Sequence, residues 1–222
     1  MQFFDAALDI FQRCLDMKRN VQGNAKDSVD VAVTLQSMAL VHWKGTCDLE
    51  QSLTNYQECL DIYEDNVKTA ETRLPQLQKH IAEVVRNMGL VCTEQNDFEQ
   101  ALQFAERSLV LAQAKSGKGS VEVAVALQTI AKIRMKTKEH KMALKFYAKS
   151  LAIFKRAHGE DHPSFGEASF CIGMCHKELG NRESALKSVR QSLACFTACY
   201  GEHHSETKKA HDWALLLPEM RK

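Results

Sequence analysis

The chain has 222 residues, of which 45% are hydrophobic and 26% are charged, as in an ordinary soluble globular protein. Its 29 basic residues nearly balance its 28 acidic residues, so the net charge of +1 lacks the basic excess that is typical of nucleic-acid binders. With 3 prolines and 10 glycines, it has too few turn-forming residues for an all-β sandwich.

The eight cysteines could form disulfide bonds in a secreted protein. They lie within helical apolar patterns, however, and the first residues, from Met1 to Asp5, lack the basic stretch and long apolar run of a signal peptide. No window contains the roughly 18 apolar residues of a membrane-spanning helix. We therefore expect a cytoplasmic protein with reduced thiols and no insertion into a membrane.

An internal repeat runs through the chain. Residues 28–39 and residues 120–131 lie 92 positions apart, and eight of the twelve aligned residues are identical. A small residue followed by leucine recurs at nearly regular intervals, of which the last two are equal and the second is the longest. The small residues are Ala7, Ser52, Ala101, Ala143 and Ala185. A period of this length predicts a stack of identical supersecondary units, and the apolar spacing within each unit predicts two helices.

The expected elements follow from this register. In chain order they are a lone helix at 3–19, helix pairs at 27–64, 76–115, 119–157 and 163–199, and a C-terminal capping helix at 204–217. The lone helix matches the second helix of a pair, and we call such helices second-type and the first helices of the pairs first-type. We expect one domain over residues 1–222 that belongs to a larger protein. We expect a larger protein because the first helix of the N-terminal pair is missing from the sequence.

Small residues recur where the two helices of a pair should cross. They are Ala39, Gly89, Ala131 and Gly173 on the first helices, and Ser52, Ala101, Ala143 and Ala185 on the second helices. Minimal side chains let two helix axes approach to about 8 Å. Leu215 occupies the crossing position of the last helix, so we expect no closely packed partner helix there.

The longest interval, between Ser52 and Ala101, contains seven extra residues, about two helical turns. Val67, Ala70 and Leu74 continue an apolar face across this insertion, so we expect a lengthened helix before Pro75 rather than a loop.

Residues that start and stop helices agree with these bounds. Prolines at positions 75 and 163 fit the first turn of a helix, where a missing N–H costs nothing. Gly180 fits a C-cap, Asn96 with Glu99 fits a capping box, and His162 fits a helix cap. Three of the five second-type helices that we expect end near glycines at positions 117, 159 and 201, and a fourth ends near Gly23.

An apolar residue followed by the small crossing residue, an Ala-Leu pair and a Gly-x-x-His-Pro linker together resemble the tetratricopeptide repeat. The linker is Gly-Glu-Asp-His-Pro at residues 159–163, and residues 201–205 are a divergent copy of it. The 42-residue unit with this linker resembles the repeats of kinesin light chain. The resemblance implies an all-α fold, a right-handed α-solenoid of antiparallel helix pairs in which the first helices line a concave groove.

The resemblance also implies which side chains face this groove. They lie one, four and five residues after the small crossing residue and three before it. These positions hold Gln36, Leu40, Trp43, Lys44, Arg86, Leu90, Thr93, Glu94, Gln128, Lys132, Met135, Lys136, Phe170, Met174, Lys177 and Glu178. Apolar anchors flanked by charges suit an extended or helical peptide, although the same apolar residues could simply pack against neighbouring helices.

Two other groups of residues resemble a zinc site and a phosphate-binding loop, but their positions in the sequence argue against both. Cys195, Cys199 and His203 are spaced four residues apart and could share a helix face that binds zinc, but Cys195 falls at a core position of the repeat. Residues 117–120, Gly-Lys-Gly-Ser, lack the earlier glycine and the strand of a phosphate-binding loop. No nucleophile, base and orienting group occur together, so we expect no enzyme activity, no cofactor and no metal site.

The expected function is therefore a scaffold or adaptor that binds a protein or peptide partner in the groove, with a cytoskeletal or motor-associated partner as one candidate. The alternative is a self-association module of a larger protein. An RNA-binding helical repeat is disfavoured, since the apolar groove and the near-zero net charge do not suit bases and phosphates.

Overall fold

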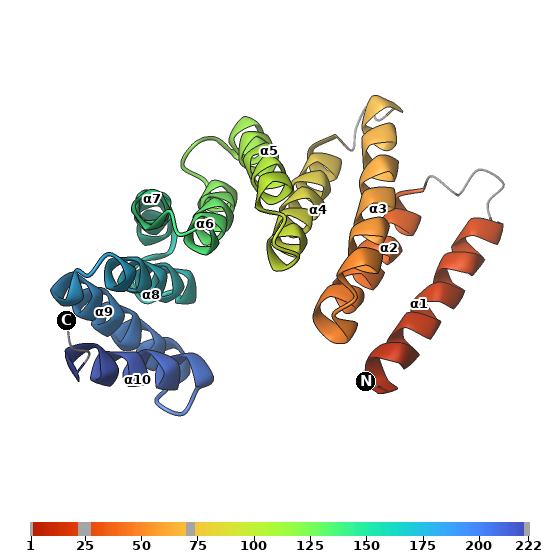
Figure 1. Cartoon of the computed structure of the whole chain (residues 1–222). Helices are drawn as coiled ribbons and strands as arrows, with labels where there is room; N and C mark the ends of the chain where they lie inside the picture. Colours follow the sequence, from red (N-terminus) through yellow and green to blue (C-terminus); the bar gives the residue numbers. More distant parts are fainter. Residues whose placement is uncertain (1, 22–27, 70–73, 220–222) are drawn as a thin grey trace. The chain divides into compact units, whose positions relative to one another are not determined.

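The computed structural model describes residues 2–21, 28–69 and 74–219, and the regular secondary structure of these residues is entirely helical (Figure 1). The elements are α1 (Gln2–Val21), α2 (Val29–Val41), the π-helical turn η2 (His42–Thr46), α3 (Leu49–Thr69), α4 (Leu74–Glu94), α5 (Phe98–Ser116), α6 (Val121–Lys136), α7 (His140–His158), α8 (Pro163–Glu178), α9 (Arg182–Tyr200) and α10 (Ser205–Glu219). The lone helix, the four helix pairs and the last helix predicted from the repeat are all present. Among the described residues, no helix has the length and the apolar character needed to cross a membrane.

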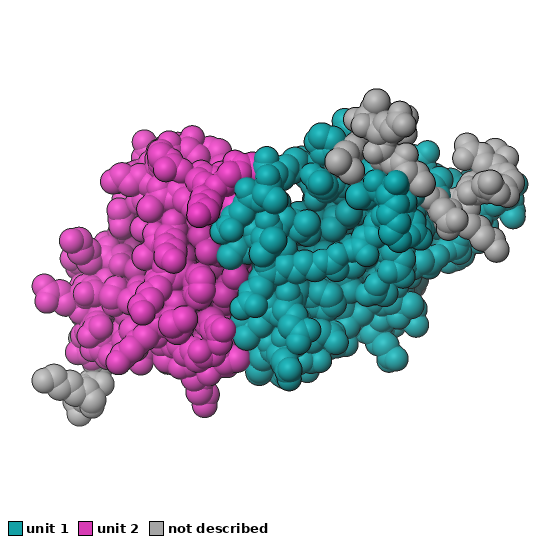
Figure 2. Space-filling view, turned by 90° about the horizontal axis from the view of Figure 1, so that it is seen from above, with its two compact units in different colours: residues 1–115 teal, residues 116–222 magenta. Residues whose placement is uncertain are grey.

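The chain divides into two compact units, residues 1–115 and residues 116–222 (Figure 2). Unit 1 contains α1 to α5 except for Ser116, the last residue of α5. Unit 2 contains Ser116 and α6 to α10. In unit 1, apolar side chains of α1 to α4 form a core around Leu35 and Tyr56. In unit 2, smaller clusters gather around Tyr147, Phe154 and Phe196. Each unit therefore has apolar residues of its own to hold its helices together.

The predicted helix crossings are confirmed at the two glycines. A Cβ at Gly173 would lie 2.7 Å from a methyl carbon of Val189 and 3.2 Å from the carbonyl oxygen of Ala185. A Cβ at Gly89 would lie 3.1 Å from the carbonyl oxygen of Ala101. Because these distances are too short for a comfortable contact, only glycine lets the two helices approach this closely.

The other two crossings use alanine and serine. Ala131 and Ala143 are both completely buried where α6 crosses α7. At the crossing of α2 and α3, the hydroxyl of Ser52 donates a 2.8 Å hydrogen bond to the carbonyl oxygen of Ala39. This bond satisfies a buried hydroxyl, which would otherwise destabilise the fold.

The linker between α7 and α8 is organised by a histidine cap, as predicted. Nδ1 of His162 accepts a 3.2 Å hydrogen bond from the backbone N–H of Ser164, and Pro163 is the first residue of α8. The linker begins at Gly159, whose φ of +84° and ψ of −178° are accessible to glycine alone. The helix end that we predicted near Gly23 lies outside the described residues.

The predicted capping box at Asn96 and Glu99 is wrong. The cap of α5 is Asp97, whose Oδ1 accepts a 3.1 Å hydrogen bond from the N–H of Gln100. Asn96 instead has a positive φ of +64°, the left-handed conformation that asparagine tolerates better than most residues. It therefore belongs to the turn that follows α4, while Gly180 closes α8 in the predicted way with a φ of +75°.

The insertion of the long repeat lengthens two helices. We expected it to lengthen α3, but most of the added length is in α4, the next helix. Relative to the crossing residue, α3 ends two positions later than α5, α7 and α9 do. On the same scale, α4 begins five positions earlier than α6 and α8 do. The insertion therefore lengthens α3 slightly and α4 by more than a turn. Leu74 begins α4, and Ala70 lies outside the described residues.

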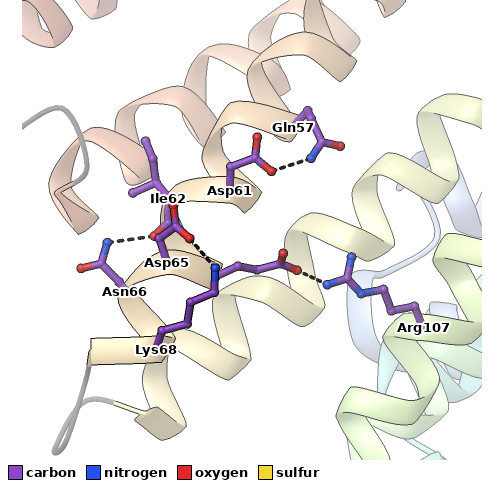
Figure 3. Close-up of polar contacts among 8 residues, drawn as sticks. Gln57, Asp61, Ile62, Asp65, Asn66, Lys68 and Arg107 are labelled. Carbon is purple, nitrogen blue, oxygen red and sulfur yellow. Dashed lines mark hydrogen bonds and ion pairs between the residues drawn. The ribbon is translucent and has the colours of Figure 1, made fainter.

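Ion pairs stabilise the C-terminal half of α3 (Figure 3). Nζ of Lys68 lies 2.7 Å from Oδ1 of Asp65, one turn earlier on the same helix. Arg107 of α5 pairs with Glu64, which connects α3 to a helix that is two elements further along the chain. Such exposed pairs each contribute only about 0–1 kcal/mol, so they add little to the stability of the fold.

Candidate functional site

A shallow hollow of about 220 Å³ lies in unit 1 between α2 and α4. Its lining residues are Val33, Gln36, Ser37 and Leu40 of α2, Tyr56 of α3, and His80, Glu83 and Asn87 of α4. Two of the predicted groove residues, Gln36 and Leu40, therefore lie together. The first helices of two successive repeats supply most of the wall.

Exposed apolar groups and fixed polar groups meet in this hollow. Leu40 is 47% exposed and Val33 is 42% exposed. The buried amide of Asn87 donates a 3.3 Å hydrogen bond to the hydroxyl of Tyr56, whose pKa burial raises to about 12. The hollow thus offers two aliphatic contacts beside an amide that is already held in one orientation. This combination suits a segment with both an apolar side chain and exposed peptide groups.

Trp43 was predicted as a groove anchor, and the structure places it elsewhere. Its side chain is 5% exposed and belongs to the core of unit 1. Trp43 lies in the π-helical turn that begins at His42, and Thr93, the residue at the equivalent position of α4, is buried as well. Lys44 covers the ring, with Nζ 3.4 Å from the ring centroid and 3.5 Å from Oε1 of Glu94.

Three of the four predicted residues of α4 are less accessible than Leu40, and the fourth, Glu94, is exposed. Leu90 is half-buried and packs against the core of unit 1, and Arg86 is also half-buried. Thr93 is buried, and its hydroxyl donates to the carbonyl oxygen of Gly89 at 2.6 Å. For Leu90, packing against neighbouring helices accounts for much of its surface.

In unit 2 the corresponding helix faces are richer in lysine and aromatic residues. Nζ of Lys177 lies 4.9 Å from the ring centroid of Trp213, and Nζ of Lys209 lies 5.0 Å from that of Phe170. Both pairs connect α8 with α10, and Lys132 of α6 is exposed. Each ammonium group also has a carboxylate neighbour, because Nζ of Lys177 lies 2.9 Å from Oε1 of Glu178 and Nζ of Lys209 lies 3.5 Å from Oε2 of Glu206.

Of the remaining predicted residues of unit 2, Lys136 and Glu178 are exposed and the other four are partly or almost fully buried. Phe170 is almost fully buried, and Met174 packs beside it in the cluster formed by α8, α9 and α10. Gln128 is half-buried. Met135 is half-buried too, with its sulfur 3.3 Å from the thiol of Cys175.

The residue sets chosen from the sequence missed the positions two and six residues before the crossing residue. In unit 1 these positions hold Ser37 and Val33 on α2, and Asn87 and Glu83 on α4; all four line the hollow. They lie three and seven residues before the position of Leu40 or Leu90, so helical periodicity puts them on the same face. The periodicity of the sequence could therefore have found them.

The equivalent positions in unit 2 include Glu167 and Cys171 of α8. Tyr147 and Cys171 are hydrogen-bonded to each other, as are Tyr56 and Asn87 at the corresponding positions of unit 1. Burial and the neighbouring Glu206 raise the pKa of the Glu167 carboxyl, while Lys209 acts in the opposite direction. Burial also raises the pKa of the Cys171 thiol.

Cys195 of α9 occupies the core position expected for it, whereas Cys199 is partly exposed. The thiol of Cys195 is buried and lies 3.3 Å from the carbonyl oxygen of His162, and the thiol of Cys199 lies 2.9 Å from that of Asp161. Burial raises the pKa of Cys195 to about 11, which disfavours the thiolate that a zinc ion needs as a ligand. Across the part of the chain that the structure describes, no three histidine, cysteine or acidic residues are grouped so as to hold a metal ion.

The repeat register, the close helix crossings and the inner faces formed by first helices define a helical-repeat protein. The tetratricopeptide-repeat family model matches residues 80–156 and 122–198, which together cover more than half of the sequence. The chain belongs to the tetratricopeptide-repeat family. No curated protein matches it at a significant level.

Several solved structures share the fold. BtubC (BKLC) from P. vanneervenii has a TM-score of 0.70 and 14% identity, over 97% of this chain and 91% of that chain. The repeats of a putative kinesin light chain from Podosopora anserina have a TM-score of 0.66 and 12% identity, over 89% of each chain. Aspartyl phosphate phosphatase F from Bacillus subtilis has a TM-score of 0.77 and 16% identity, over 96% of this chain but 51% of that chain. At these identities the likeness concerns the fold alone.

Proposed function

We propose that this chain is a protein-interaction module that binds an extended peptide segment in the hollow between α2 and α4. The observation that carries the proposal is the exposure of Leu40 and Val33 beside the fixed amide of Asn87. A large apolar side chain that remains exposed next to ordered hydrogen-bonding groups is typical of a recognition surface. The ligand would place an apolar side chain between the two aliphatic residues and a peptide group against Gln36 or Asn87.

The inner face of unit 2 supports the same class of function with a different preference. Lys132, Lys177 and Lys209 are cationic, and Phe170 and Trp213 lie beneath two of the ammonium groups. Lys177 and Lys209 are also paired with Glu178 and Glu206, so the exposed Lys132 is the charge that favours a segment with a carboxylate, because complementary charges raise the association rate and exclude cationic partners. We expect binding at this face to weaken as the salt concentration rises.

The biological role that fits such a module is a cytoplasmic scaffold or adaptor. The fold shared with the repeats of a putative kinesin light chain suggests a partner attached to cytoskeletal or motor machinery as one candidate.

The test begins with a peptide selected against the purified chain from a display library. Leu40→Ala should weaken its binding about tenfold, or roughly 1.4 kcal/mol, because one anchor often dominates a small interface. Val110→Ala is the matched control, since Val110 is an apolar residue of α5 with 63% exposure and does not line the hollow. Equal weakening by the two variants, or weakening by the control alone, would contradict the proposed site.

A further inference from the structure

Helix α7 carries a row of three lysines on its exposed surface. Lys141, Lys145 and Lys149 lie four residues apart and are all exposed; they are called here the α7 row. Successive members are about 6 Å apart along the helix axis, so the three ammonium groups can reach one ligand on one side of α7. The helix contains no acidic residue from His140 to His158, so no carboxylate of α7 offsets their charge.

Comparison of the repeats shows that α7 alone among the second-type helices has three like charges in this row. The row positions lie two residues before the small crossing residue, and two and six residues after it. In the other second-type helices they hold Asp5, Asp9 and Arg13 in α1; Glu50, Thr54 and Glu58 in α3; Glu99, Gln103 and Arg107 in α5; and Glu183, Lys187 and Gln191 in α9. The first position is acidic in every one of these four helices, so the packing of the repeat does not call for lysine there.

The charges of the α7 row oppose the stability of the helix that carries them. The first turn of a helix favours acidic residues, because its free N–H groups carry partial positive charge, and α7 has no acidic residue there. Like charges four residues apart on a helix also repel each other. None of the three lysines forms an ion pair with another residue that the structure describes. Local features that oppose stability are expected where they serve a function.

The other cations of α7 already have partners within unit 2. Lys155 pairs with Glu160, and Nη2 of Arg156 donates a 2.8 Å hydrogen bond to a carbonyl oxygen in the turn before α6. The acidic residue just before α7, Glu139, pairs with Arg134. Within α7, the row is therefore the part whose positive charge is available to an anionic ligand.

We propose that the α7 row binds an acidic helix of a partner protein, in which carboxylates recur every four residues. Carboxylates with this spacing are also about 6 Å apart, so each can meet one lysine whichever way the partner helix runs. Apolar atoms beside the row suit a helix as well. Met142 is 39% exposed, and the ring of Phe146 lies 5.9 Å from Nζ of Lys149. Each of these side chains follows a lysine of the row by one residue and offers a contact to aliphatic side chains.

Two other kinds of anionic partner suit the row less well. A nucleic acid is bound by a domain with a clear basic excess, whereas this chain has a net charge of +1. An anionic membrane is recognised by clusters of about 4–8 basic residues, and the row has fewer. A short acidic helix requires only a few charges at the right spacing, because each pair forms at close range.

The first test is titration of the full chain with a labelled synthetic helix of alanine and glutamine that has glutamate at every fourth position. The parent should bind it, and the affinity should fall as salt is added. Lys145→Glu should weaken binding about tenfold, because it reverses the central charge of the row. Lys187→Glu is the matched control, since Lys187 is exposed at the same repeat position of α9 and has no lysine four residues away. Equal weakening by the two variants, or a parent that does not bind, overturns the proposal.

The second test separates a binding role from a structural one. Lys145→Glu should raise the melting temperature, because two attractive pairs replace two repulsive ones along the helix. Lys141→Glu should raise it as well, since it places an acidic residue in the first turn, as in α3, α5 and α9. Variants that melt higher and bind the peptide less support the proposal. Lower melting temperatures for both would show that the lysines stabilise the fold, and would overturn it.

A third measurement identifies the class of anion. A peptide of the same composition, with its glutamates in one consecutive run, should bind more weakly than the probe; equal binding would contradict the four-residue spacing. Vesicles that contain an anionic phospholipid and a single-stranded oligonucleotide with the same charge as the probe should bind more weakly too. A preference of the parent for either of them, lost in Lys145→Glu, assigns the row to that partner and overturns the assignment to an acidic helix.

Discussion

At the scale of single residues, small side chains decide how closely the helices of a pair approach. Gly173 and Gly89 have no room for a Cβ in their present surroundings, and Ala131 is completely buried against α7. Large apolar side chains differ strongly in exposure. Leu40 is exposed in the hollow, whereas Trp43 is buried in the core. Residues of similar character thus act differently because their neighbours differ.

The alanine crossing leads to a stability prediction. Ala131→Leu should lower the free energy of unfolding by about 1–3 kcal/mol or more, because the larger side chain overpacks the contact of α6 with α7. Thermal denaturation measures the effect. Ala152→Leu adds the same atoms at an exposed position of α7 and should change the melting temperature little. A melting temperature of Ala131→Leu within a degree of the parent would show that this crossing tolerates bulk.

Two glutamates of unit 2 should affect stability in opposite directions as pH changes. Burial and Glu206 raise the pKa of Glu167, so its charged form is disfavoured in the folded chain. Glu167→Gln should therefore raise the melting temperature at pH 7, and this gain should disappear as the pH falls through the raised pKa and below the ordinary one.

Glu139 provides the opposite case. Hydrogen bonds from Arg134 and Thr137 lower the pKa of this carboxyl, so the folded chain stabilises its charged form. Glu139→Gln should lower the melting temperature at pH 7, with the loss vanishing as the pH falls below the lowered pKa. Melting curves of both variants and the parent from neutral to acidic pH test the pair; shifts of the same sign would contradict this electrostatic account.

At the scale of helices, the ends depend on particular caps and turns. Asp97, His162 and Gly180 each satisfy or close a helix terminus, while η2 interrupts the α-helical phase after Val41. The long repeat is accommodated by added helical turns, mostly at the start of α4. The consequence for function is that α2 and α4 bring their inner residues to one hollow despite their different lengths.

The histidine cap of α8 should contribute measurably to stability. His162→Ala removes the acceptor for the Ser164 N–H and should cost about 1 kcal/mol, the usual effect of losing an N-cap. His162→Asn should recover most of this loss, since its side-chain oxygen can accept the same bond. Chemical denaturation compares the variants. His158→Ala, which removes only the ring stacked on His162, separates stacking from capping.

At the scale of the whole molecule, the sequence by itself determined the helices of the described residues, their pairing and the crossing residues of the four pairs, because a small crossing residue recurs in each unit. It also placed Gln36 and Leu40 on one face, and the positions of Asn87 and Val33 follow from the same helical period. Tertiary structure decided the rest. Trp43 lies in the core rather than in the groove, Asp97 replaces Asn96 as a cap, and the extra residues are shared between α3 and α4. These outcomes depend on which neighbours compete for the same space and hydrogen bonds, and a periodic pattern does not record that competition.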